Sequence, residues 1–325
     1  MTSFLKTLPL LFSASIVLAG TAAHAQSTTP IRLVIGFPPG GALDNLARSL
    51  AEELRTTLKE PVLVENRPGA STRISIEAVK AARPDGRTIL IGATPAFVLF
   101  PMTYARLNYD VDKDFIPVAH LANVPSVVSA GADQPFKTIP DYVAWIKKHP
   151  ANASVGMTNL GGGLHFSVLQ LSKAIGVPLT PVTYRGGAPL ATDLIGDHVP
   201  IGTDALASQL ELHRSGKLRI LGVAGTKRLS WLPDVPTIKE SGYDAFDRAN
   251  ASYAAFVPAG TPKEVVTKLE TVLLAAIRSP QVRAQLDRMG LEPTGLPGTD
   301  VKRIMDEDRL YWRPIVKASG FTSED

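Results

Sequence analysis

Short apolar runs rich in β-branched residues alternate with helical repeats along the chain. The first such run, residues 31–35, ends in a turn rich in proline and glycine at 37–42. Leucines then recur every four residues from 46 to 58, which is the spacing of a helix that buries one face. Strands that alternate with helices of this length predict an α/β fold whose sheets are mainly parallel and carry helices on both faces.

The same rhythm continues through the rest of the chain. The pattern predicts further strands at 62–64, 88–91, 126–128, 154–156, 179–184, 218–224 and 251–257. It predicts further helices at 74–82, 139–149, 165–175, 190–195 and 263–278. Because no internal repeat and no low-complexity linker separates these elements, we expect the chain to cross more than once between two lobes.

The first 25 residues are typical of a secretory signal peptide. Lys6 supplies a positive charge, and 8–20 is an apolar run shorter than the roughly 20 residues that span a bilayer. Ala23-His24-Ala25 then provides the small residues of a cleavage site. We expect cleavage after Ala25 and export to the periplasm, the alternative being an uncleaved N-terminal anchor.

Composition excludes several classes of protein. The chain has no cysteine, which excludes thiolate nucleophiles, thiolate zinc sites and iron–sulfur clusters. The net charge is +4, and removal of Lys6, the only charged residue of the signal, lowers it to +3. This mild charge favours an anionic ligand, whereas a nucleic-acid partner would require a basic stripe that the sequence lacks.

Motifs for catalysis and for metal binding are missing from the sequence. No Gly-x-Ser-x-Gly elbow, P-loop or dinucleotide fingerprint occurs, and no two histidines have the spacing of metal ligands. Asp110, Asp112 and Asp114 imitate the start of a calcium loop, but Phe115 stands where the loop needs glycine. We therefore expect a binding protein with no enzymatic activity, no metal and no cofactor.

Three glycine-bearing turns between a strand and a helix are the candidate binding site. They lie at 37–42, 158–163 and 184–187. The first N–H groups of a helix lack partners and together carry about +0.5 charge, and glycine lets an anion approach them closely. Ligands of open α/β sheets also bind at the carboxyl ends of the strands. The alternative for each turn is that its glycines only permit a tight connection.

The residues of these turns resemble those of the Bug family, the solute-binding receptors of tripartite tricarboxylate transporters. The matching motifs run in family order across the mature chain: 30–34 with 37–44, 64–70, 84–86, 109–110 with 113–115, 184–188, 193–196, 216–219, 232–237 and 258–262. The resemblance implies a two-lobe fold of the type II periplasmic-binding-protein class with two crossover strands. Lobe one is expected at 26–126 plus 249–325, and lobe two at 127–248.

Membership of this family implies both a function and a set of ligand contacts. The chain is expected to be a monomeric receptor that closes over a small carboxylate and delivers it to the membrane subunits of a transporter. The implied contacts in lobe one are Phe37, Pro38, Pro39, Gly40, Gly41, Ala42, Thr94 and Pro95. Those in lobe two are Thr158, Asn159, Gly161, Gly162, His165, Tyr184, Gly186 and Asp204.

Two of the implied contacts have an alternative role. Asp204 either accepts a hydrogen bond from a ligand amine or from water, or only orders its loop. His165 either lines the site or packs at the start of a helix. An α/β hydrolase that uses His165 and a nearby hydroxyl is a rival function. A receptor that presents its ligand to a membrane sensor kinase is another.

Three departures from the family pattern concern the ligand. The run 95–100 is apolar where the family has polar groups, Gly162 and Gly163 replace hydroxyl residues, and Arg73 stands where asparagine is usual. These changes favour an aromatic or extended carboxylate, with Phe97 lining the site and Arg73 as a second anion contact. The alternative is that Phe97 and Phe100 are core residues and that Arg73 faces solvent.

Overall fold

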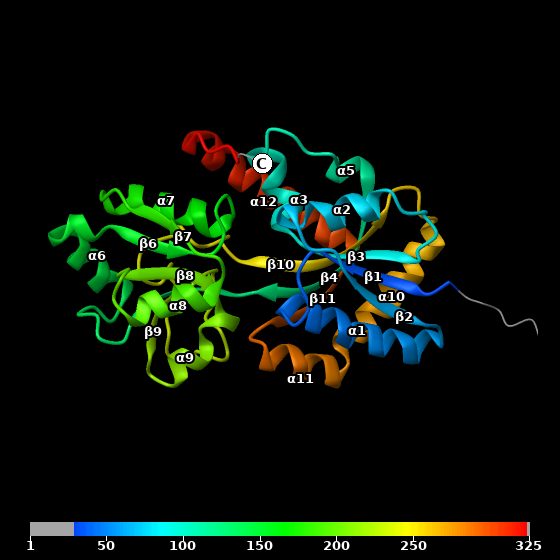
Figure 1. The fold of residues 1–325 in the computed structure, drawn as a ribbon, viewed down its shortest axis with the longest axis horizontal. Helices are drawn as coiled ribbons and strands as arrows, with labels where there is room; N and C mark the ends of the chain where they lie inside the picture. The colour runs from blue at the N-terminus through cyan, green and yellow to red at the C-terminus, as the bar shows by residue number, and fades with distance from the viewer. Residues whose placement is uncertain (1–28, 324–325) are drawn as a thin grey trace, which may run out of the picture.

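Two β-sheets organise the chain, and the computed structural model describes residues 29–323 (Figure 1). The predicted signal peptide and its cleavage site lie outside the described residues. The first sheet contains β1 (Ile31–Ile35), β2 (Val62–Asn66), β3 (Thr88–Ala93), β4 (Phe115–Val124), β10 (Ala251–Pro258) and β11 (Glu292–Pro297), in the order β11-β4-β10-β3-β1-β2. The second contains β5 (Ser126–Gly131), β6 (Ser154–Met157), β7 (Thr180–Thr183), β8 (Ile201–Ala205) and β9 (Leu218–Val223), in the order β7-β6-β8-β5-β9.

Helices cover both sheets, as the sequence predicted. Those of the first lobe are α1 (Ala42–Leu58), α2 (Arg73–Lys80), α3 (Pro95–Val98), α4 (Phe100–Thr103), α5 (Val111–Asp114), α10 (Lys263–Arg278), α11 (Pro280–Arg288) and α12 (Gly298–Ser319). Those of the second are α6 (Ile139–Lys148), α7 (Gly163–Ile175), α8 (Gly187–Ile195) and α9 (Leu210–Arg214). Short 3₁₀ turns are η1 (Ala70–Thr72), η2 (Pro150–Asn152) and η3 (Leu206–Ser208).

Each sheet is mixed, where the sequence analysis expected mainly parallel sheets. β1 runs parallel to β2 and β3, and β6 runs parallel to β7 and β8. The strands that join the lobes account for most of the difference, and β11 adds a further antiparallel pairing with β4. β4 leaves the first lobe with only Pro125 before β5, and β10 returns through the same edge. Because β4 leaves the sheet and β10 enters it at the same edge, the two strands must run in opposite directions, and they pair antiparallel.

The carboxyl ends of the parallel strands face the opposite lobe. In the first sheet, Val124 at the end of β4 pairs with Ala251 of β10, and Ala93 at the end of β3 pairs with Tyr253 of the same strand. The ends of β3 and β4 therefore lie at the same edge of the sheet. In the second sheet, Ser126 at the start of β5 pairs with Ala205 at the end of β8, which is parallel to β6 and, through it, to β7. The turns that follow β1, β3, β6, β7 and β8 therefore all lie on the two facing edges.

The helical repeats bury the faces that the pattern predicted. The leucines of α1 at 46, 50 and 54 are buried with residues of α10 and α11 against one face of the first sheet. The other face carries α2, α3 and α12, whose buried residues include Trp312. In Figure 1 the end of α12, in red, extends beyond its own sheet toward α7 of the second lobe.

Candidate ligand-binding site

The turn after β1 is held from inside by Asp44, whose side chain is 2% exposed. Its carboxylate accepts hydrogen bonds from the backbone N–H of Gly40 at 2.9 Å, from Arg48 Nε at 2.8 Å and from Asn66 Nδ2 at 2.8 Å. These bonds, led by that from Arg48, lower the pKa of Asp44 to about 2. The backbone N–H of Gly40, which the sequence analysis expected to bind the ligand, is therefore already hydrogen-bonded to Asp44. The helix α1 then begins at Gly41, which provides no side-chain cap.

The turn after β6 is held by Asp204, which is buried at the end of β8. Asp204 Oδ1 accepts from the Thr158 hydroxyl at 2.6 Å, and Oδ2 accepts from the Ser208 hydroxyl at 2.5 Å. A Cβ at Gly187 would lie 2.5 Å from Oδ2, so the start of α8 packs directly on this carboxylate. The arrangement favours the role in which Asp204 orders its loop.

His165 also acts on the glycine turn. The backbone N–H of Gly161 donates to His165 Nδ1 at 3.3 Å, which places the proton of the neutral ring on Nε2. Burial lowers the pKa of His165 and so favours this neutral form. The ring contacts Phe166 and Phe321, with centroids 5.1 and 5.0 Å away. His165 thus packs at the start of α7, which itself begins at Gly162 without a side-chain cap.

The turn after β7 is shaped by Tyr184 and Gly186. The Tyr184 hydroxyl donates to Asp193 Oδ2 at 2.8 Å, and burial together with this carboxylate raises the pKa of Tyr184 to about 12. The hydroxyl is therefore committed to α8. Gly186 has φ +114°, a conformation that requires glycine, and it begins α8 without a side-chain cap. All three helices that begin at the predicted turns thus present their first N–H groups without a side-chain cap.

The structure places Phe97 in the core. Its side chain is fully buried and stacks on Phe256 with ring centroids 4.1 Å apart. The ring therefore does not line the site, because it fills the space between α3 and the sheet. Thr94 is also buried, and its hydroxyl pairs with that of Ser252 at 3.1 Å. Thr94 and Pro95 border a narrow gap between the lobes that Gly163 and Trp312 also line.

Arg73 follows a strained segment at the same edge. Ala70, Ser71 and Thr72 have φ values of 45°, 52° and 75°, a left-handed conformation that costs about 1–3 kcal/mol for each non-glycine residue. Arg73 Nε donates to Ala70 O at 3.0 Å, and its guanidinium lies 4.4 Å from the centroid of the Tyr104 ring. Arg73 is therefore held beside Tyr104 at the edge that faces lobe two.

Exposed apolar side chains occur at two of the glycine turns and in the first turn of α2, and the sequence analysis did not assign two of these side chains to the site. Leu160, in the turn after β6, is 50% exposed, and Ile74, in the first turn of α2, is similarly exposed. Phe37, which was predicted, is partly exposed in the turn after β1. A large apolar residue within a glycine-rich turn is the signal that would have identified Leu160.

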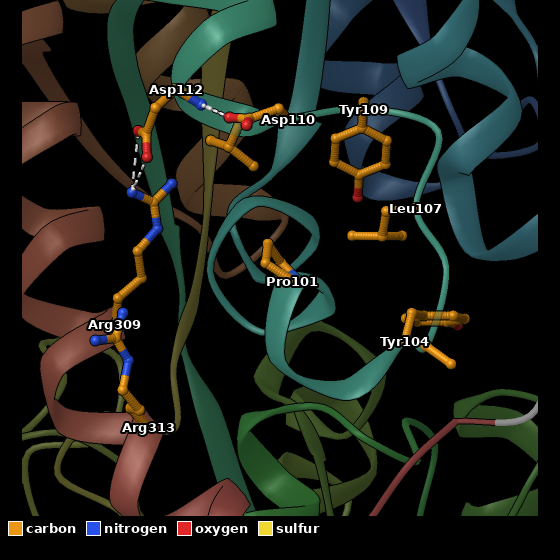
Figure 2. Close-up of a pocket in the computed structure, with 10 residues that line it drawn as sticks. Pro101, Tyr104, Leu107, Tyr109, Asp110, Asp112, Arg309 and Arg313 are labelled. Carbon is orange, nitrogen blue, oxygen red and sulfur yellow. Dashed lines mark hydrogen bonds and ion pairs between the residues drawn. The ribbon is translucent and has the colours of Figure 1, made fainter.

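Two of the cavities formed by residues 29–323 lie away from the turns. One of about 570 Å³ adjoins the crossovers and is lined by residues that include Asn123, Lys227, Arg248, Asn250, Glu292 and Asp308. The other, of about 440 Å³, lies in the first lobe. Figure 2 shows its Arg309 directed toward Asp112, with Tyr104 and Leu107 on the opposite side. Neither cavity includes a residue of the three predicted turns.

Within residues 29–323, no group of three His, Asp or Glu side chains is placed to hold a metal ion. Every helix in that range is too short or too polar to span a bilayer.

Comparison with known proteins identifies relatives of the chain. A family model described as "Tripartite tricarboxylate transporter family receptor" matches residues 46–321. The periplasmic binding protein BugD is 32% identical, with a TM-score of 0.76 over 91% of this chain and 99% of that one. Rpa4515 of R. palustris, solved with adipate, is 30% identical, with a TM-score of 0.80 over 91% and 99%. MatC of Rhodopseudomonas palustris, solved with bound malate, is 28% identical, with a TM-score of 0.75 over 88% and 98%.

These similarities extend over nearly the whole described chain. They confirm the resemblance to Bug receptors and the two-lobe α/β fold. The proteins they identify are solute-binding receptors rather than enzymes, which removes the hydrolase as a rival function.

Proposed function

The chain belongs to the tripartite tricarboxylate transporter receptor family, and from this premise we propose that it captures a small carboxylate between its lobes in the periplasm. The bound carboxylate is then delivered to the membrane subunits of a tripartite tricarboxylate transporter. Lobe one comprises 26–126 and 249–325, and lobe two comprises 127–248. The signal peptide is removed after Ala25.

One observation carries this proposal. Three helices, α1, α7 and α8, begin at Gly41, Gly162 and Gly186 without a side-chain cap, and all three starts lie on the facing edges of the sheets. Backbone N–H groups at a helix start attract a carboxylate, and glycine admits it to hydrogen-bond distance. A carboxylate bound by amides of both lobes draws the lobes together, which is the closure expected of such a receptor.

The side chains nearest these turns support the amides. Asp44 and His165 each accept a hydrogen bond from a backbone N–H of a turn, and Asp204 accepts one from the Thr158 hydroxyl at the start of another turn. A site whose backbone is already held loses less conformational freedom when the ligand binds. The direct contacts are therefore main-chain groups of 37–42, 159–163 and 186–187 other than the Gly40 and Gly161 amides, which Asp44 and His165 occupy. Arg73 is a second contact at the edge of lobe one.

The ligands of two relatives agree with a carboxylate. Adipate and malate, present in the structures of Rpa4515 and MatC, are both small dicarboxylates. Micromolar binding requires only about −8 kcal/mol, which a few charge-assisted hydrogen bonds and modest apolar burial supply. Leu160 and Phe37 offer apolar contact to the body of such a ligand.

The test is to identify the bound molecule directly. The protein is purified under native conditions from the periplasm of cells that express the full chain, and native mass spectrometry measures any bound mass. We expect a carboxylic acid that is recovered unchanged. A thermal-shift series then compares adipate and malate with adipamide, which has the length of adipate but no charge. Stabilisation by adipamide equal to that by adipate, or a bound compound without an acidic group, would overturn the proposal.

A further inference from the structure

The segment that follows α12 connects the two lobes at the glycine turn of lobe two. Gly320 ends α12 in a left-handed conformation with φ +66°, and the chain then turns back toward lobe one. The backbone N–H of Ser323 donates to Thr103 O at 2.6 Å, and Ser323 pairs with Tyr104 as an isolated β-bridge. Segment 320–323 is thereby attached to α4 of lobe one.

The side chain of Phe321 extends from this segment to lobe two. Its ring meets His165 edge-on, with centroids 5.0 Å apart and planes at 69°, and meets Phe166 at 5.9 Å and 79°. These are the tilted geometries that aromatic pairs prefer. A Cβ placed at Gly161 would lie 2.8 Å from Phe321 Cε1, so the ring lies directly against the backbone of the glycine turn.

Phe321, His165 and Gly161 form one packed unit. Phe321 limits the ring of His165 on one side, and His165 Nδ1 accepts the N–H of Gly161. Gly161 has φ +75°, so both its backbone conformation and its contact with Phe321 require glycine. The last residue of the turn meets α12 as well, because Trp312 Cζ2 lies 3.5 Å from a Cβ placed at Gly163.

We propose that Phe321 is a positioning residue for ligand binding, which holds His165 and Gly161 so that the first N–H groups of α7 are directed toward the ligand. Because Phe321 belongs to lobe one and the turn to lobe two, it also aligns the turn with the facing edge of lobe one. This inference rests on the proposed function, since it assigns a role at the same ligand site. Phe321 does not contact the ligand itself.

Two substitutions test this role. Phe321→Ala removes the ring, whereas Phe321→Tyr keeps its shape and its edge-on contacts. Leu310→Ala is the matched control, because Leu310 belongs to α12, the helix that precedes the segment, and its side chain is 70% exposed. Isothermal titration with adipate measures affinity in all three variants. Aromatic contacts of this kind correspond to about a two- to tenfold change in an equilibrium constant, so Phe321→Ala should bind adipate about that much more weakly. Phe321→Tyr and Leu310→Ala should match the unsubstituted protein.

A second measurement separates positioning from general stability. In ¹⁵N NMR spectra without ligand, Phe321→Ala should shift the amide signals of Gly161, Gly162 and Gly163. It should also change the His165 ring nitrogens from the single tautomer with the proton on Nε2 toward a mixture. The amides of α1, in the other lobe, should not move.

The outcomes distinguish this inference from the proposed function. If adipate binds the unsubstituted protein and Phe321→Ala equally, or if the Gly161–Gly163 amides and the His165 tautomer are unchanged, Phe321 has no positioning role. If adipate fails to bind even the unsubstituted protein, the proposed function fails for this carboxylate. The His165 tautomer in the ligand-free protein then still decides whether Phe321 holds the turn.

Discussion

The side chain of Asn250 accepts a hydrogen bond from the backbone N–H of Ser126 at 2.8 Å, and so ties the returning crossover to the outgoing one. Its Nδ2 also donates to Ala224 O at 3.2 Å. One amide therefore links the start of β10 with the start of β5 and with the residue after β9. Both connections between the sheets pass beside this amide, since Ser126 follows the outgoing crossover and Asn250 precedes the returning one.

Substitution of Asn250 should loosen this junction. Asn250→Ala leaves the Ser126 N–H and the Ala224 carbonyl without their partner, which should lower the free energy of unfolding by about 1–3 kcal/mol. Asn250→Asp keeps an acceptor for Ser126 but sets a carboxylate oxygen against the Ala224 carbonyl, so it should also lower the stability. Urea unfolding measures the stabilities, and small-angle X-ray scattering should show a broader range of lobe separations for Asn250→Ala. Identical scattering curves and stabilities would show that Asn250 does not constrain the junction.

Asp44 should make stability depend on pH in the acid range. Its pKa is about 2 in the folded protein against an ordinary value of 3.8, so its ionised form contributes about 2 kcal/mol to folding above pH 4. This contribution is lost as pH falls from about 4 through 2, because the carboxyl group then becomes protonated in both states. Asp44→Asn should therefore be less stable than the unsubstituted protein at pH 7, and the difference should shrink toward pH 2. A difference that stays constant from pH 7 to pH 2 would contradict this assignment.

Thr158 should matter because it satisfies a buried carboxylate. Thr158→Val keeps the shape of the side chain but leaves Asp204 Oδ1 without its donor, at a cost of about 1–3 kcal/mol. Thr158→Ser keeps the hydroxyl and serves as the control. Thermal unfolding compares the three proteins, and adipate titration shows whether the turn also loses affinity. Equal melting temperatures for Thr158→Val and Thr158→Ser would mean that the hydroxyl does not support Asp204.

A substitution at Gly41 should affect ligand binding without affecting the stability of the fold. A Cβ at this position would meet no atom closer than Pro38 O at 3.9 Å, and its φ of −78° suits any residue. Gly41→Ala should therefore leave the melting temperature within about 2 °C. If a carboxylate approaches the start of α1, the added methyl group should weaken adipate binding at least about tenfold. Gly196→Ala, in lobe two at φ −83° and with no atom closer than 3.4 Å to the added Cβ, controls for the loss of a glycine.

Patterned elements could be predicted from the sequence, and elements with irregular patterns could not. The helix α10 begins and ends where the apolar repeat does, at Lys263 and Arg278. In contrast, β4 escaped prediction because Pro117, His120 and Asn123 interrupt its apolar run, and its two neighbouring strands satisfy the backbone there. The helix α12 escaped prediction because Pro314 and dense charges mask its buried stripe, which includes Val301 and Met305.

The candidate site divides in the same way. The three turns could be predicted, because glycine at a helix start has a local physical reason that the sequence displays. The side chains that hold those turns could not, because they act across long separations. Thr158 and Asp204 are 46 residues apart, and Phe321 and His165 come from different lobes. The sequence could not decide whether Phe97 lines the ligand site or packs in the core, since an aromatic residue after a strand is suited to both roles.

The central claim is that main-chain amides on both lobes bind the negative charge of the ligand. The direct measurement is a TROSY ¹⁵N–¹H titration of the mature protein with the co-purified carboxylate, or with adipate. We predict that the amides of Gly41–Leu43, Gly162–Leu164 and Gly187 shift together with one dissociation constant, while those at the start of α6, where Thr138 already provides a cap, stay in place. Shifts confined to one lobe, or located at the cavities around Arg248 or Arg309 instead, would contradict the claim.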